Sequence, residues 1–268
     1  MKRLYKVLIW VFALTGLIVT MSFVSTSQDS TPCSSVFINV DNTNVFIDKN
    51  DVDSLIKKRV GTLKGKSMDK IDIAQIENII RGNSYVQNAQ AYSTIDGEVS
   101  IAVRLRVPLL RIFNPLNQSF YVDANGRYMP LSEKASSRVL MVNGYIYDSY
   151  IARTVRVLDW KDTMIKGKTM MDSLYTLANF IQKDKFLNAQ IQQAYINNDR
   201  EIELIPYIGK QTIIMGDISD MDLKFKNLVS FYKKEMSRYG WSTCSCINLK
   251  YKNQIVCTKT NKFNKQND

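Results

Sequence analysis

A long uncharged segment near the start most constrains how this chain can fold. Lys2, Arg3 and Lys6 precede residues 7 to 28, which carry no charge and are mostly apolar as far as residue 24. A helix needs about 20 apolar residues to cross a bilayer, and this segment is just long enough. Basic residues on its amino-terminal side favour a cytoplasmic amino terminus. We therefore expect a cytoplasmic tail at 1–6, a transmembrane helix at 7–27 and the remaining chain outside the inner membrane.

The alternative for the same segment is a cleaved secretory signal. A signal has the same basic start but an apolar core of only about 7–15 residues. The run here is longer, so the sequence favours an uncleaved, single-pass anchor with periplasmic domains behind it.

The absence of histidine limits the chemistry that the chain can perform. It removes Ser-His-Asp and Cys-His activation of a nucleophile, histidine-ligated zinc and the commonest general base. The formal net charge of +11, from 36 basic and 25 acidic residues, is best explained as a solvated surface that stays soluble through its charge. In an extracytoplasmic domain it also suits anionic lipid heads, acidic partners or an anionic wall polymer. We expect no catalytic residue, no metal, no cofactor, no nucleic acid and no small-molecule substrate.

The pattern of apolar residues predicts an α+β chain with two folded parts behind the anchor. A polar linker at 28–35 precedes a βααββ module at 36–107, whose second helix places Ile73, Ile76, Ile79 and Ile80 on one face. Two strands around Asp96-Gly97 then form a hairpin. Residues 108–260 read as a mixed, mostly antiparallel β domain with flanking helices, and 261–268 as a disordered tail.

The order of these parts resembles the FtsQ/DivIB family of bacterial cell-division proteins. The stretch "IDIAQIENIIRGNSYVQNAQAYSTIDGEVSIAVRLRVPLLRI" is similar to the second half of that family's POTRA domain, with Pro108 at its arginine-x-proline junction. "FYVDANGRYMPL" resembles the first hairpin of its β domain, and "CINLKYKNQIVCTK" the closing strand pair. The resemblance implies a non-catalytic, single-pass membrane scaffold of the divisome at the septum.

The end of the chain is the candidate binding site. Strands at chain ends often lie at sheet edges, whose free backbone groups can pair with another chain. In the FtsQ family this region receives a strand from the FtsB partner, which is itself paired with FtsL. The resemblance therefore implies a docking line formed by Tyr251, Asn253, Gln254, Ile255, Val256, Thr258 and Lys259. Lys250, Lys252 and Lys259 would engage acidic residues of such a partner.

Three cysteines, Cys244, Cys246 and Cys257, lie in the same stretch. A closed structural zinc site needs four ligands, which these three thiols do not supply. If Lys252-Asn253 is a two-residue turn, Cys246 is the diagonal neighbour of Cys257, at the limit of the distance that a disulfide spans. The sequence leaves two possibilities: a Cys246–Cys257 disulfide, or small buried thiols in a sheet.

Two other functions stay open at this point. POTRA modules also occur in envelope assembly and secretion proteins, which usually carry several modules or a long β-barrel. A wall hydrolase would need paired carboxylates in a pocket. Asp159 and Asp162 lie near Trp160, but a solvated loop is the better explanation of these residues.

Overall fold

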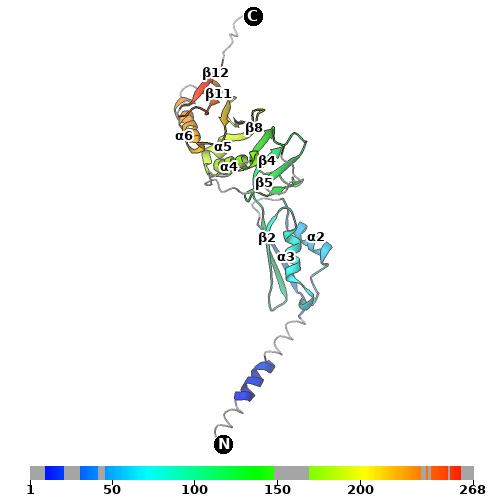
Figure 1. Ribbon diagram of the computed structural model, residues 1–268. Coiled ribbons are helices and arrows are strands. Elements are labelled where there is room, and N and C mark those ends of the chain that lie inside the picture. Colours follow the sequence, from blue (N-terminus) through cyan, green and yellow to red (C-terminus); the bar gives the residue numbers. More distant parts are fainter. Residues whose placement is uncertain are drawn as a thin grey trace. The chain divides into compact units, whose positions relative to one another are not determined.

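The computed structural model describes residues 10–20, 31–41, 46–147, 169–236, 240, 243–252 and 254–260. The chain divides into two compact units, Met1–Arg106 and Val107–Asp268 (Figure 1). Residues 10–20 form a helix in the middle of the predicted transmembrane segment, whose other residues lie outside the described ranges. In the part of the chain that the structure describes, no helix has both the length and the apolar character needed to span a bilayer.

The first unit has the βααββ order predicted from the sequence. Its three-stranded sheet has the order β1-β3-β2, with β1 parallel and β2 antiparallel to the central β3. Its elements are β1 (Ser35–Val40), α2 (Lys49–Arg59), the short 3-10 helix η1 (Met68–Lys70), α3 (Ile73–Arg81), β2 (Val86–Ser93) and β3 (Glu98–Leu105).

Local side chains fix where the two helices of this unit begin. The Asp48 carboxylate accepts hydrogen bonds from the backbone of Asn50 and Asp51, and Asp51 bonds back to the Asp48 N–H. This reciprocal pair satisfies amide groups that have no partner inside the helix. Asp72 accepts from Gln75 N at the start of α3 in the same way.

The core of the first unit lies between these helices and one face of the sheet. On α3, Ile76 and Ile80 are fully buried, whereas Ile79 is only partly buried. On β3 the alternate residues Val99 and Ile101 are buried against them, and Ala102 on the opposite face is exposed. Apolar residues occupy every second position of this strand in the sequence, and the structure buries that face.

We expect Ile80→Ala to lower the free energy of unfolding of the first unit by about 2–5 kcal/mol, because it leaves a cavity in a closed core. Ile79→Ala is the matched control, since the same atoms are removed from a partly exposed position. Urea unfolding of both variants checks this, and equal losses would contradict the assignment of the core face.

The second unit is built on one mixed sheet of nine strands, in the order β12-β11-β10-β9-β8-β7-β4-β5-β6. Its elements are β4 (Pro108–Phe113), β5 (Ser119–Asp123), β6 (Tyr128–Met129), β7 (Leu140–Gly144), α4 (Met170–Lys183), α5 (Lys185–Gln190), β8 (Ile191–Ile196), β9 (Ile202–Pro206), β10 (Thr212–Gly216), α6 (Met221–Phe231), the π-helix η3 (Tyr232–Met236), β11 (Cys244–Asn248) and β12 (Val256–Lys259).

Antiparallel pairs outnumber parallel ones among the described strands, as the sequence predicted. Strands β4, β7 and β8 lie parallel to one another, and β10 is parallel to β11. The connection from β10 to β11 runs through α6 and η3, because parallel neighbours need a crossover.

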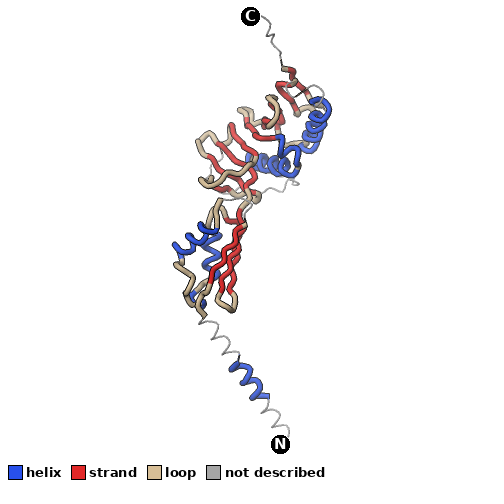
Figure 2. Tube along the Cα trace, turned by 180° about the vertical axis from the view of Figure 1, so that it is seen from behind, coloured by secondary structure: helices blue, strands red, loops and turns tan. Residues whose placement is uncertain are grey.

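Helices α4, α5 and α6 gather on one face of the large sheet (Figures 1 and 2). Leu174 and Leu177 of α4 and Phe225 of α6 are buried there against strand residues such as Ile213 and Ile247. Of the last two strands, β11 is thus packed into the core, whereas β12 lies at the end of the sheet.

Candidate functional site

Strand β12 is a terminal strand of the nine-stranded sheet and pairs only with β11 among the described strands. It contains four residues, of which Val256, Thr258 and Lys259 are exposed. Only Cys257, and Ile255 just before the strand, pack partly against the core. The strand is therefore short, exposed on its outer face and accessible along its backbone.

The hydrogen bonds of β12 show which of its backbone groups face outward. Thr260 N donates to Thr243 O at 3.0 Å, and Ser245 Oγ donates to Thr258 O at 3.1 Å, so Thr258 and Thr260 face β11. Backbone groups of successive residues in an antiparallel strand point to alternate sides. The N–H and C=O groups of Cys257 and Lys259 therefore point toward the open edge.

A disulfide between Cys244 and Cys257 ties β11 to β12, with the two Cα atoms 5.6 Å apart. The Cys246–Cys257 disulfide considered from the sequence is therefore wrong, since Cys246 is a free thiol. Burial raises the pKa of this thiol, and the Glu203 carboxylate raises it further. A raised pKa makes Cys246 a poor nucleophile for exchange with the neighbouring disulfide.

The error in the cysteine pairing came from the turn. Strands β11 and β12 are joined by residues 249–255 rather than by a two-residue turn, and Ile247 instead of Asn248 lies opposite Cys257. A bulge between Cys244 and Cys246 then changes the alternation, so that Cys244 and Ile247 are the buried residues of β11. Cys244, not Cys246, faces Cys257.

Reduction of this disulfide should loosen the end of the sheet. Closing a loop of about 15 residues contributes about 3 kcal/mol in the chain-entropy description, and these cysteines are 13 positions apart. We expect Cys257→Ser to lower the free energy of unfolding by about 2–3 kcal/mol, measured by urea unfolding without reductant.

Cys246→Ser is the matched control and should change stability little, because its thiol takes no part in the bond. Peptide mapping without reduction should recover a peptide pair joined through Cys244 and Cys257. A linked pair that contained Cys246 would contradict the observed register.

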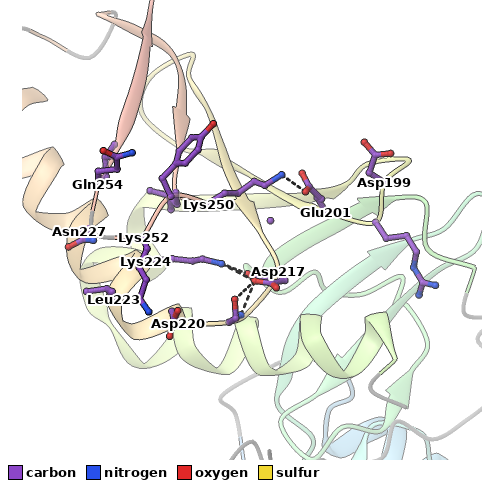
Figure 3. Close-up of a pocket in the computed structure, with 16 residues that line it drawn as sticks. Asp199, Glu201, Asp217, Asp220, Leu223, Lys224, Asn227, Lys250, Lys252 and Gln254 are labelled. Carbon is purple, nitrogen blue, oxygen red and sulfur yellow. Dashed lines mark hydrogen bonds and ion pairs between the residues drawn. The ribbon is translucent and has the colours of Figure 1, made fainter. Parts of the chain in front are cut away.

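A cavity of about 390 Å³ lies beside the loop that leads into β12 (Figure 3). Three segments far apart in the sequence line it: the turn at 199–201 between β8 and β9, residues from 216 to 227 at the end of β10 and the start of α6, and residues from 249 to 255. An extended chain that continued past the amino-terminal end of β12 would therefore meet this cavity.

The charges in this cavity largely neutralise one another. Lys250 Nζ forms an ion pair with Glu201, and Lys224 Nζ lies 3.0 Å from Asp217 Oδ1 (Figure 3). The hydrogen bond to Glu201 raises the pKa of Lys250. Since Lys250 is already paired, it is a weaker candidate for binding an acidic partner than Lys252 or Lys259, which form no ion pair within the described ranges.

Asp217 has the most strongly shifted carboxyl group at this site. The hydrogen bond from the Ser219 hydroxyl, followed by the hydrogen bond and charge of Lys224, lowers the pKa of Asp217 to about 2. A lowered pKa means that the charged form is favoured in the folded state. The charged Asp217 carboxylate therefore stabilises the folded state fully above the ordinary aspartate pKa of about 4. This stabilisation is lost as the pH falls toward about 2.

We expect Ser219→Ala to raise the titration midpoint of the Asp217 carboxyl group toward the ordinary value of about 4. The substitution removes the hydrogen bond that is the largest cause of the lowered pKa. Carboxyl carbon NMR between acidic and neutral pH measures this midpoint. Ser173→Ala, an equivalent change on α4, is the control. An unchanged midpoint in Ser219→Ala would show that the hydroxyl does not stabilise the carboxylate.

The structure places the predicted docking residues in two groups. Val256, Thr258 and Lys259 lie on the edge strand, whereas Tyr251, Gln254 and Ile255 line the cavity. Asn253 lies outside the described residues.

Sequence reasoning missed the cavity residues supplied by other segments, chiefly Glu201, Asp217 and Lys224. No local pattern marks them, since only the fold brings them next to the loop at 249–255.

The residues weighed for wall hydrolysis, Asp159 and Asp162, lie outside the described residues. Within the described part, no group of three or more cysteine, aspartate or glutamate side chains is placed to hold a metal ion.

Comparison with known families gives two matches. The model described as "FtsQ/DivIB, C-terminal related" matches residues 107–258, and a POTRA-like domain model matches residues 31–104. These ranges follow the two compact units of the structure. A search among curated proteins finds no match.

Proposed function

This chain belongs to the FtsQ/DivIB family, and from that premise we propose that it is a non-catalytic scaffold that gathers division proteins at the septum. Members of the family are division proteins without catalytic activity. The match over residues 107–258 favours division over the POTRA-containing assembly and secretion proteins, because it covers the β domain that carries the terminal strand.

The observation that carries this proposal is the open edge of β12. Its outward N–H and C=O groups, at Cys257 and Lys259, are positioned to pair with an added strand. The partner is a single-pass division protein of the FtsB type, itself paired with an FtsL-type protein. Lys252 and Lys259 at the rim attract acidic residues of that partner and increase the rate of association more than its lifetime.

Backbone pairing alone gives modest affinity at so short an edge. Each added hydrogen bond contributes about 0.5–1.5 kcal/mol net, so the outward groups of β12 need support from side chains. Tyr251 and Val256 supply it, since their side chains are 52% and 41% exposed beside the edge. Apolar burial there adds to binding without specifying the strand register.

The membrane part of the proposal rests on sequence. Residues 7–27 anchor the chain in the inner membrane, residues 1–6 stay in the cytoplasm, and the folded domains behind the anchor lie outside the membrane. The three basic residues before the apolar segment support this orientation.

We expect Lys259→Pro to weaken partner binding about tenfold or more, because proline has no N–H to donate across the edge. Proline is tolerated on an edge strand where the N–H faces solvent. Lys259→Ala is the matched control: it removes the same charge but keeps the N–H. Co-purification of the partner with each variant from the native host measures the effect.

Equal loss in both Lys259 variants would assign the effect to the charge and contradict strand addition. Full binding by Lys259→Pro would show that the partner does not pair with this strand.

Photo-crosslinking in cells identifies the partner directly. A photo-reactive residue replaces Thr258, which is exposed on β12, and Ser100 on β3 of the first unit serves as the control position. We expect a small single-pass membrane protein to be captured from position 258 and not from position 100. Absence of an adduct at 258, with normal expression and membrane insertion, would remove the docking role of this edge.

A further inference from the structure

A second cavity of the large unit, about 460 Å³ in volume, differs in charge from the one beside β12. It lies where the parallel strands β4, β7 and β8 begin, next to the junction of α4 and α5. Its described lining contains three cations, Arg111, Arg138 and Lys185, and no aspartate or glutamate. No ion pair of the described residues involves these three side chains.

Arg111 is held in place without being neutralised. Its Nε donates to Ser119 Oγ at 3.1 Å, and its guanidinium carbon lies 4.6 Å from the ring centre of Phe113 and 5.6 Å from that of Tyr121. The two aromatic rings stabilise the cation and limit its rotation. Its terminal nitrogens make no hydrogen bond to any residue of the described part.

Arg138 approaches the same cavity from a segment that is fixed to the sheet. The Tyr121 hydroxyl contacts Ser136 Oγ at 3.2 Å and accepts from Ser137 N at 3.3 Å, which anchors the residues just before Arg138. The Arg138 guanidinium lies over the Tyr207 ring at 5.5 Å. Two arginines that stack on aromatic rings therefore line one cavity, each with its charge uncompensated by a carboxylate.

Asp184, which directly precedes Lys185 in the sequence, does not neutralise the charge of this cavity. Its Oδ1 accepts hydrogen bonds from the backbone of Phe186 and Leu187 at the start of α5. It is not part of the cavity lining. The cavity beside β12, by contrast, pairs two of its lysines, Lys224 and Lys250, with Asp217 and Glu201.

From this arrangement we propose that the cavity binds a phosphorylated saccharide or polyol. Planar guanidinium groups match the geometry of phosphate oxygens. Two guanidinium groups from different segments favour an oxyanion that carries two charges or that bridges the two side chains. The volume exceeds that of a bare anion and lies in the range of small-ligand pockets. Gln182, Asn188 and Gln192 in the lining supply neutral hydrogen-bonding groups for hydroxyls.

The phosphate of such a ligand has two possible sources, a soluble sugar phosphate or the head group of an anionic lipid. Both share the chemistry that the cavity recognises. This site is separate from the docking edge, so its failure leaves the scaffold proposal untouched.

The test is isothermal titration calorimetry of the full-length chain in a non-ionic detergent. Glucose 1-phosphate represents the soluble source, and dihexanoylphosphatidylglycerol below its micelle concentration represents the lipid head group. Glucose and dihexanoylphosphatidylcholine are the probes without net negative charge. We expect at least one of the two anionic probes to bind with a dissociation constant below about 1 mM, and its counterpart without net negative charge to bind far more weakly.

Variants assign the binding to this cavity. Arg138→Gln should weaken binding about tenfold or more, and Lys185→Gln, at an exposed position where folding is not at risk, should weaken it about threefold or more. Lys183→Gln is the matched control, because it removes the same charge two residues from Lys185 but outside the lining. No heat from either anionic probe at millimolar concentration, or equal weakening by Lys183→Gln, would overturn the proposal.

Discussion

An open sheet has two terminal strands, each with one side of its backbone unpaired, and this constraint shapes the large unit. At one end, β6 is two residues long and both are buried, so that end is covered. At the other end, β12 is exposed and its outward groups face away from β11. The sheet therefore offers backbone pairing at one of its two ends, and that end lies within the family match.

The same exposed strand has few contacts to hold it in place. It pairs with one neighbour and contributes only Cys257 to the core. The Cys244–Cys257 disulfide compensates for this, because it fixes β12 to a residue that is itself buried. A covalent bond at this position leaves the outer backbone accessible, whereas covering the strand with a helix would not. Stability and accessibility are thus supplied at the same edge.

The two cavities of the large unit differ in their charge. Beside β12, lysines and carboxylates pair within the protein, so the cavity adds shape more than net charge to the docking region. At the start of the parallel strands, arginines stack on aromatic rings instead of pairing with carboxylates, so their charge is not neutralised. Exposed ion pairs add little stability. The paired lysines beside β12 and the unpaired arginines of the second cavity therefore differ mainly in the charged molecules that each cavity attracts.

Much of the fold followed from the sequence because it depends on local patterns. The alternation of apolar residues from Val99 to Leu105 and the isoleucine face of α3 specify a strand and a helix from neighbouring residues alone. These features need no knowledge of what packs from elsewhere.

The tertiary structure decided what depends on register and on distant segments. A longer connection at 249–255 and a bulge near Ser245 changed which cysteine faces Cys257, and a shift of one residue in a strand exchanges its faces. The two cavities join residues up to about a hundred positions apart, such as Arg111 and Tyr207. The sequence determined the elements and their order, whereas pairing partners, the disulfide and the cavities arose only from packing, because they depend on contacts that no local pattern encodes.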